Sequence, residues 1–256
     1  MKIGQKTHKR LKINQLKPKV RIAAGTKTTT MQKMKNQMLS LLFVALALVS
    51  AGAQTRTLEK FDELSVTGEV DVILKSGAPA VSISTAGIDP DDVNVEVREG
   101  VLRIKVLKSL LKSDDRIKVV VSHGQLRKIR ALAGANISGR EPIRGDQLAL
   151  KAGSGAKVKL KVAVNKLEAS ASEGGEIEVT GTAETQDVKV ASGGQYEGYE
   201  LATEYAYVGA NTGGVAKITA HQLLEANANT GGVIEYKGNP AKTRFREHLT
   251  GKIREG

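Results

Sequence analysis

The sequence predicts an all-β protein: a right-handed parallel β-helix, or solenoid, whose N-terminal strands are partly antiparallel. Three observations support this prediction. Glycine-centred turns recur about every twenty residues, apolar and polar residues alternate between the turns, and only 3% of the 256 residues are aromatic. A constant period indicates stacked coils, alternation indicates strands with one buried face, and a narrow solenoid core needs mainly small side chains.

Six glycine-centred turns define the period. The hexapeptide Ala-Asn-Thr-Gly-Gly-Val occurs at residues 210–215 and again at 228–233. The first glycines of the six turns are residues 134, 155, 174, 193, 213 and 231, with steps of 21, 19, 19, 20 and 18. Glycine suits a sharp corner because it tolerates positive φ. The predicted corner residues are Gly155, Gly174, Gly175, Gly193, Gly194, Gly213, Gly214, Gly231 and Gly232. About ten such coils, stacked about 4.8 Å apart, would form a rod about 45–50 Å long.

The segment between residues 61 and 122 also alternates, with many β-branched residues at the apolar positions. This pattern predicts short strands that each bury one face. Glu99-Gly100 separates two alternating runs, and this step predicts a hairpin turn. A polar connection is expected at residues 109–115, with one helical turn at its start. No amphipathic helix is predicted in the mature chain.

The positive charge of the chain is concentrated at one end. The net charge is +12, but residues 1–53 hold eleven Lys or Arg and no Asp or Glu. Residues 54–256 hold 28 basic and 27 acidic residues. Because this body is nearly neutral, we expect no basic stripe and no nucleic-acid partner. The absence of cysteine excludes disulfides, thiol catalysis and cysteine-ligated metals.

Residues 31–53 have the three parts of a secretory signal peptide. Lysines precede an apolar run at residues 38–49, and Ala51 and Ala53 stand at the −3 and −1 positions of a cleavage site before Gln54. The run is short for a bilayer core of about 30 Å, so no stable transmembrane span is expected after cleavage. Export to the periplasm, the cell surface or the medium is therefore predicted.

The remaining chain divides into three further segments. Residues 1–30 are a basic upstream extension, either disordered or preceding a true translation start at Met31 or Met34. Residues 54–242 are expected to form a single β-helix domain. The charged segment 243–256 is expected to be a C-terminal cap or tail, which would shield the open end of the last coil.

The segment from Phe61 to Val72, Phe-Asp-Glu-Leu-Ser-Val-Thr-Gly-Glu-Val-Asp-Val, resembles the start of a known family. With the hairpin around Gly100 and the serial glycine turns, it is similar to the putative auto-transporter adhesin head GIN domain family of Bacteroidetes-type cell-envelope proteins. The resemblance covers about residues 57–240. It implies an exported single-stranded β-helix of unknown ligand, and it implies no reaction, since the family supplies no catalytic residues to carry over.

Acidic clusters offer two candidate sites. Asp89, Asp91 and Asp92 surround a proline, and Asp114-Asp115 form a second group. Carboxylates in such groups would bind Ca²⁺ or serve in acid–base hydrolysis, but neither group has the spacing of a metal-binding loop. Aspartates in polar turns also cap the backbone, and we favour this structural interpretation.

Other catalytic patterns are weaker still. Glu173, Glu176 and Glu178 alternate with small or apolar residues, which is typical of a solvated strand face. The three histidines of the mature chain, at positions 123, 221 and 248, lack metal-ligand spacing. We therefore predict no catalytic residues, no cofactor and no metal.

Four of the five tyrosines, Tyr196, Tyr199, Tyr205 and Tyr207, lie within twelve residues of one another. Exposed tyrosines on a rigid sheet would form a binding patch for a glycan or a cell-surface protein. Alternatively, they cover one side of the solenoid and flank its core.

Three functions stay open from the sequence. The preferred one is a non-enzymatic, exported cell-envelope protein with an adhesin-like or scaffolding role. The alternative is a carbohydrate-active β-helix enzyme, a polysaccharide lyase or hydrolase, which would show converging carboxylates and a basic residue on adjacent coils. The third is a structural protein that self-associates through its strand edges. The oligomeric state is not predicted.

Overall fold

The computed structural model describes residues 54–106 and 116–256, which belong to one compact unit, Gly52–Gly256. The predicted signal peptide and the polar connection at 109–115 lie outside the described residues, as do Asp114 and Asp115. The described strands are β1 (Gln54–Thr57), β2 (Glu63–Thr67), β3 (Asp71–Ser76), β4 (Ala80–Ala86), β5 (Asn94–Arg98), β6 (Val101–Lys105), β7 (Arg116–His123), β8 (Lys128–Leu132), β9 (Asn136–Ala152), β10 (Lys157–Ser172), β11 (Glu176–Ala191), β12 (Gln195–Gly198), β13 (Leu201–Ala210), β14 (Val215–Thr219), β15 (Leu223–Asn229), β16 (Val233–Lys237), β17 (Lys242–His248) and β18 (Lys252–Glu255).

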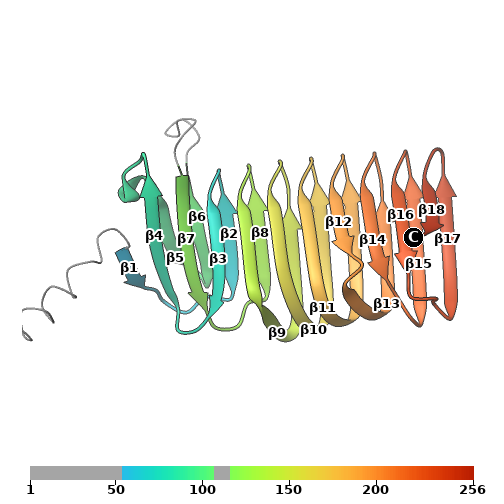
Figure 1. The fold of residues 1–256 in the computed structure, drawn as a ribbon, viewed down its shortest axis with the longest axis horizontal. Helices are drawn as coiled ribbons and strands as arrows, with labels where there is room; N and C mark the ends of the chain where they lie inside the picture. Colours follow the sequence, from blue (N-terminus) through green and yellow to red (C-terminus); the bar gives the residue numbers. More distant parts are fainter. Residues whose placement is uncertain (1–53, 107–115) are drawn as a thin grey trace, which may run out of the picture. The chain divides into compact units, whose positions relative to one another are not determined.

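Helical structure is confined to one short turn in this part of the chain. It is the 3₁₀ helix η1 (Pro90–Asp92). Across residues 54–106 and 116–256, no helix is long and apolar enough to cross a membrane. The all-β prediction is confirmed, since parallel coils stack along one axis as a β-solenoid (Figure 1).

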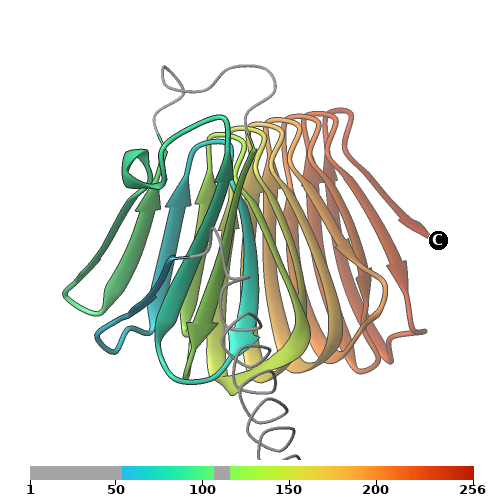
Figure 2. The same cartoon turned by 60° about the vertical axis from the view of Figure 1, so that its left-hand side comes forward.

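The solenoid has two faces joined by tight turns along one edge (Figure 2). Most strands of one face lead into these turns, and we call that face the pre-turn sheet. In order of pairing it holds β5, β6, β2, β8, the second halves of β9, β10 and β11, then β13, β15 and β17. The other face is the post-turn sheet, which holds, in order of pairing, β1, β4, β7, β3, the first halves of β9 to β11, then β12, β14, β16 and β18.

The N-terminal layers stack out of chain order. Strands β2 and β3 lie between the layer of β6 and β7 and the layer of β8 and β9, all in parallel pairs. Strands β4 and β1 add to the end antiparallel, as does β5. The hairpin predicted at Glu99-Gly100 is confirmed, because β5 and β6 pair antiparallel with Arg98 opposite Val101.

The regular part of the solenoid has about seven turns rather than the ten predicted. The prediction assumed that the whole mature chain winds at twenty residues per coil. Instead, regular winding begins at β8, and the residues before it build the inserted layer and the antiparallel end. Seven coils at a strand spacing of about 4.8 Å span roughly 30–35 Å along the axis.

Each tight turn is a two-residue turn with two left-handed residues, the type I′ geometry. Its first central residue has φ of 47–54° in the six turns predicted from sequence, and its second, the first glycine of each motif, has φ of 71–79°. The turn is closed by a hydrogen bond from the residue after it, such as Gly194 N–H to Ala191 O at 2.9 Å. Consecutive turns are also joined, for example by Gly174 N–H donating to Ser192 O at 3.2 Å.

Four of the six motifs, those that begin at glycines 174, 193, 213 and 231, have a second glycine, which is needed for a different reason. Its φ is ordinary, but it packs directly on the backbone of the preceding coil. A Cβ on Gly232 would lie 2.1 Å from the carbonyl oxygen of Ala210, and one on Gly194 would lie 2.3 Å from that of Ala171. The two glycines of the predicted corner therefore supply backbone conformation and close stacking separately.

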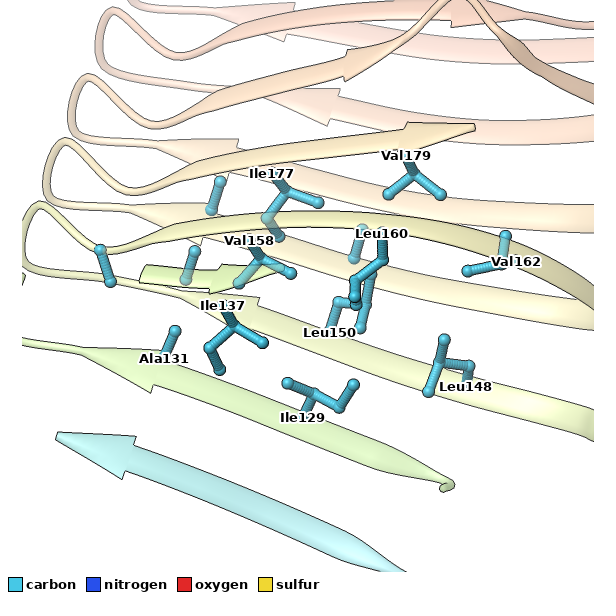
Figure 3. Packing of buried hydrophobic residues seen from close by; sticks show 14 of the residues in the cluster. Ile129, Ala131, Ile137, Leu148, Leu150, Val158, Leu160, Val162, Ile177 and Val179 are labelled. Atoms are coloured by element: carbon cyan, nitrogen blue, oxygen red, sulfur yellow. The ribbon is translucent and has the colours of Figure 1, made fainter. Parts of the chain in front are cut away.

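Inward side chains form ladders along the axis, because the same inward position recurs in each coil. One ladder runs through Ile137, Val158 and Ile177, which are register partners and are all buried (Figure 3). The next member of this ladder is Tyr196, and the one after is Ala216. The large ring is accommodated by small neighbours, since a Cβ on Gly198 would lie 2.5 Å from it.

A buried polar network surrounds the hydroxyl of Tyr196. That hydroxyl donates to Gln186 Oε1 at 3.1 Å, and Gln186 Nε2 donates to Thr203 Oγ1 at 2.7 Å and to the Thr219 carbonyl at 3.0 Å. All three side chains of the network are buried, and burial raises the pKa of Tyr196. The network links β11, β12 and β13 through side chains and reaches β14 through the Thr219 carbonyl.

Gly232→Ala is expected to lower the free energy of unfolding by about 3 kcal/mol, because its Cβ would overlap the Ala210 carbonyl. Gly213→Ala, which has open space but a φ of 71°, should cost only about 1 kcal/mol. Gly209→Ala, with open space and ordinary φ, is the matched control and should stay within about 0.5 kcal/mol of the wild type. Urea denaturation of residues 54–256 measures all three; equal losses at Gly232 and Gly209 would contradict the stacking role.

Tyr196→Phe should lose about 1 kcal/mol of unfolding free energy, the net value of one hydrogen bond. Gln186→Ala should lose about 3 kcal/mol, because it leaves the buried hydroxyls of Tyr196 and Thr203 without this partner and opens a cavity. Thermal unfolding followed by circular dichroism gives both values. A smaller loss for Gln186→Ala than for Tyr196→Phe would show that the network does not depend on the amide.

Candidate functional site

The four clustered tyrosines are not one surface, contrary to the predicted patch. Tyr196 is 1% exposed and lies in the core, so it cannot contact a ligand from outside. Tyr199 follows β12 on the post-turn sheet, whereas Tyr205 and Tyr207 lie on β13 of the pre-turn sheet. The sequence cluster is separated because the chain passes from one sheet to the other between positions 199 and 205.

Tyr199 is held in a network of side chains on the post-turn sheet. Its hydroxyl donates to Glu235 Oε2 at 3.2 Å, and the ammonium of Lys237 lies 4.1 Å from the centre of its ring. Partial burial and the hydrogen bond to Glu235 raise the pKa of Tyr199 to about 12. Hydrogen bonding from Arg254 to Glu235 holds the pKa of that carboxyl below its usual range. Tyr199 is therefore engaged within the protein.

Tyr205 and Tyr207 are the exposed members of the cluster, each 39% exposed. Alternation along β13 points both away from the core, because Ala206 and Val208 between and after them are buried. They stand in neighbouring outward rows of the pre-turn sheet. Tyr207 is in register with Asp187 on one side and Glu225 on the other.

The pre-turn sheet carries three shallow depressions in line along the solenoid axis, with volumes of about 240, 200 and 290 Å³. We call them together the trough. Neighbouring depressions share wall residues: Lys128 and Arg130 belong to the first two, and Asp187 and Lys189 to the last two. The trough is lined by outward residues of β2, β6, β8, β9, β10, β11, β13, β15 and β17. Its outward small residues are Ser65, Ala149, Ser170 and Gly209.

One side of the trough is a row of basic residues, which we call the cation row. In register order, the outward position of this row is occupied by Arg103, Ser65, Arg130, Lys151, Ser170, Lys189, Gly209, Asn227 and Arg246. Among the residues that the structure describes, Arg130, Lys151 and Arg246 have no carboxylate within ion-pair distance. Lys189 has only a long contact of 3.7 Å to Asp187.

The cation row was not predicted from the sequence, because only the overall charge of residues 54–256 was considered. Residues 54–256 are close to neutral, yet the fold brings distant cations into one line. The signal is nevertheless in the sequence: Arg130, Lys151 and Lys189 each stand four residues before the first glycine of a turn. Aligning the coils on those glycines places these residues in one row.

The acidic candidates have structural partners. Glu176 pairs with Lys157 at 2.8 Å and Glu178 with Lys159 at 2.7 Å, each across neighbouring coils. Glu173 accepts from the hydroxyl of Ser154 at 2.6 Å. These contacts fit the interpretation of a solvated strand face.

Of the aspartates around Pro90, Asp89 caps the short helix η1, and Asp91 pairs with Arg56 at 3.3 Å. Asp89 accepts a hydrogen bond from the backbone of Asp91 at 2.9 Å, and its carbonyl accepts from Asp92 N–H at 3.0 Å. Within residues 54–106 and 116–256, no three His, Asp or Glu side chains are grouped closely enough to hold a metal ion.

A wider depression of about 530 Å³ lies at the opposite corner, lined in part by Ser76, His123 and Glu141. A serine, a histidine and a carboxylate would suit a catalytic relay, but a relay needs hydrogen bonds that link the three side chains through the histidine, and the contacts here are different. His123 is buried, and its Nδ1 lies 2.7 Å from the carbonyl of Gly124. Glu141 accepts from the backbone and side chain of Ser76, which lowers its pKa. The cluster joins the corner of β9 to the end of β3.

The fold and its exposed trough define a class: a repeat-built parallel β-solenoid with an extended, open surface. The sequence profile of the family described as "Putative auto-transporter adhesin, head GIN domain" matches residues 60–240, so the chain belongs to that family. The resemblance seen in the sequence is thereby confirmed.

Solved structures share the fold. A putative adhesin from Bacteroides fragilis is 16% identical with a TM-score of 0.70, and the match covers 80% of this chain and 96% of that one. A putative lipid binding protein from Parabacteroides distasonis is 21% identical, with a TM-score of 0.61 and coverages of 81% and 98%. A putative adhesin from the same organism is 24% identical, with a TM-score of 0.59 and coverages of 80% and 96%. The comparison with curated proteins finds no significant match.

Glu235→Gln should flatten the acid dependence of stability. Because the folded pKa of Glu235 is lowered, its contribution is fully present above the unfolded value of about 4.3 and is lost as pH falls through the folded pKa. Urea midpoints measured from pH 6 to pH 2.5 should therefore fall less steeply in this variant. Glu204→Gln is the control, because the side chain of Glu204 has no hydrogen-bond partner among the described residues. Identical acid slopes for Glu235→Gln and wild type would contradict the prediction.

Proposed function

We propose that the protein is an exported, non-enzymatic cell-envelope protein whose pre-turn face binds a glycan or a cell-surface protein in an adhesin-like role. The observation that carries the proposal is the trough, an extended open surface with two exposed tyrosines on one of its strands. Tyrosine provides a large contact area at low entropic cost, and the strand ladder beneath it keeps the surface rigid.

Export is supported by family and by sequence. The family is named for a putative adhesin, and the leader at residues 31–53 has the parts of a secretory signal peptide. A long repeat surface also suits attachment, because solenoids present extended binding faces built from equivalent positions.

A carbohydrate-active enzyme on this scaffold would need an acid, a base and a substrate cleft that bring reacting groups together. The carboxylates along the trough are instead engaged in pairs: Glu63 with Lys128 at 3.2 Å, Glu168 with Lys166 at 2.5 Å and Glu225 with Arg244 at 2.6 Å. Such pairs fix side chains for recognition, and no specific observation favours a reaction.

The double variant Tyr205→Ser/Tyr207→Ser should weaken retention of residues 54–256 on cell surfaces or on a glycan array by at least about tenfold. Truncating a contacting tyrosine at an interface costs about 1–2 kcal/mol. Tyr199→Ser, on the opposite sheet, is the matched control and should retain binding. If the double variant is retained but Tyr199→Ser is not, the binding surface lies on the post-turn sheet, and the proposal is wrong.

A further inference from the structure

We propose that the trough binds a single extended chain of an acidic polysaccharide, which lies along the solenoid axis with its anionic groups on the cation row. This inference rests on the proposed binding function and names the chemical class of its ligand. It follows from the spacing of the cations, the small residues that line the trough and the polar groups on its other side.

The spacing of the cations is set by the coils. Arg130 and Lys151 stand on neighbouring strands, Lys189 is two strands beyond Lys151, and Arg246 is three strands beyond Lys189. With strands about 4.8 Å apart, the cations are separated by roughly 5–15 Å along the axis. A polymer with anionic groups at intervals of one or a few sugar units matches such a spacing.

The positions between the cations are occupied by short side chains. Ser170 separates Lys151 from Lys189, and Gly209 and Asn227 separate Lys189 from Arg246. A flexible chain can therefore approach the sheet closely at these points while its anionic groups reach the longer basic side chains. The shared walls of the three depressions make this path continuous from β6 to β17.

The other side of the trough is suited to hydroxyl groups. Glu168, Asp187, Tyr207 and Glu225 follow one another in the adjacent outward row. Their carboxylates are already paired with basic residues but retain oxygen lone pairs, which accept hydrogen bonds from sugar hydroxyls. The ring of Tyr207 offers an apolar surface for the C–H face of a sugar. Charged groups on one side and acceptors on the other match a polymer that combines sparse anions with many hydroxyls.

The same arrangement disfavours a nucleic acid or an anionic membrane. A nucleic-acid strand carries one phosphate per about 3.4 Å, so phosphates would also lie against Glu168, Asp187 and Glu225. Like charges at that distance repel. A membrane is a flat surface that touches the ends of long side chains, and it would leave the small residues lining the trough without contact.

The test is binding of purified residues 54–256 to polygalacturonate and to hyaluronate, which carry one carboxylate per sugar and one per disaccharide, by calorimetry at about 0.1 M salt, where exposed charges still attract at close range. Both polyanions should bind at least about tenfold more tightly than neutral dextran, because charge-assisted contacts exist only with the anionic polymers. Raising the salt should weaken their binding.

The double variant Arg130→Gln/Lys151→Gln should lose at least about tenfold in affinity. Lys118→Gln/Lys161→Gln, which removes two exposed cations from the post-turn sheet, should change affinity less than about twofold.

Several results would overturn the inference: equal binding of dextran, unchanged affinity in Arg130→Gln/Lys151→Gln, or tighter binding of single-stranded DNA or phosphatidylglycerol vesicles than of either polysaccharide. Melting curves of both double variants show whether they fold.

The experiments distinguish a wrong ligand class from a wrong proposed function. If polyanions do not bind but the tyrosine variants lose cell retention, only the ligand class is wrong; if polyanions bind and cell retention is absent, the adhesin-like role is wrong.

Discussion

Contact between consecutive coils at the glycine turn is the constraint on which the rest of the solenoid depends. In the four motifs with two glycines, the second glycine packs on the backbone of the previous coil so closely that no side chain fits, as at Gly194 and Gly232. The first glycine turns the chain in the left-handed region and donates a hydrogen bond to the next turn. With one edge of every coil fixed in this way, equivalent residues fall in register along both sheets. Ladders of aliphatic residues inside and rows of charged residues outside are both consequences of that register.

The sequence predicts the features that are local or periodic. Each glycine turn and the Glu99-Gly100 hairpin depend on neighbouring residues, so they can be recognised without knowing the fold. The stacking order of the N-terminal layers cannot be recognised in this way. Glu63 pairs with Val101 on one side and with Lys128 on the other. Alternation specifies which face of β2 is buried but not which strands lie beside it, and the expectation of ten regular coils was wrong for this reason.

The tyrosine cluster shows how proximity in sequence misleads in a solenoid. Tyr196 follows the second glycine of its turn at the same interval as Ile177 and Ile234, so the repeat alignment places it in the buried ladder. Tyr205 and Tyr207 lie nearby in the chain but on the opposite sheet. In a coil of about twenty residues, residues separated by one full period are neighbours, whereas residues separated by half a period face away from each other. The cations of the row are separated by full periods and are therefore neighbours. The two pairs of tyrosines in the predicted patch are separated by about half a period and therefore lie on opposite sheets.

The ends of a solenoid need a different solution from its middle, because the outermost strands lack one set of partners. At the C-terminal end, the inward position that holds Ala228 in one coil holds Glu247 in the next. The Glu247 carboxylate accepts a hydrogen bond from the backbone of Ile253 at 2.5 Å, and Phe245 packs against Tyr236 with ring centres 5.4 Å apart. A carboxylate where the ladder requires an apolar group opposes the addition of a further coil, since burying it would leave a desolvated charge. The same register that builds the aliphatic core thus places a charged group at an inward position of β17, and the outer faces, which carry the trough, are the surfaces suited to recognition.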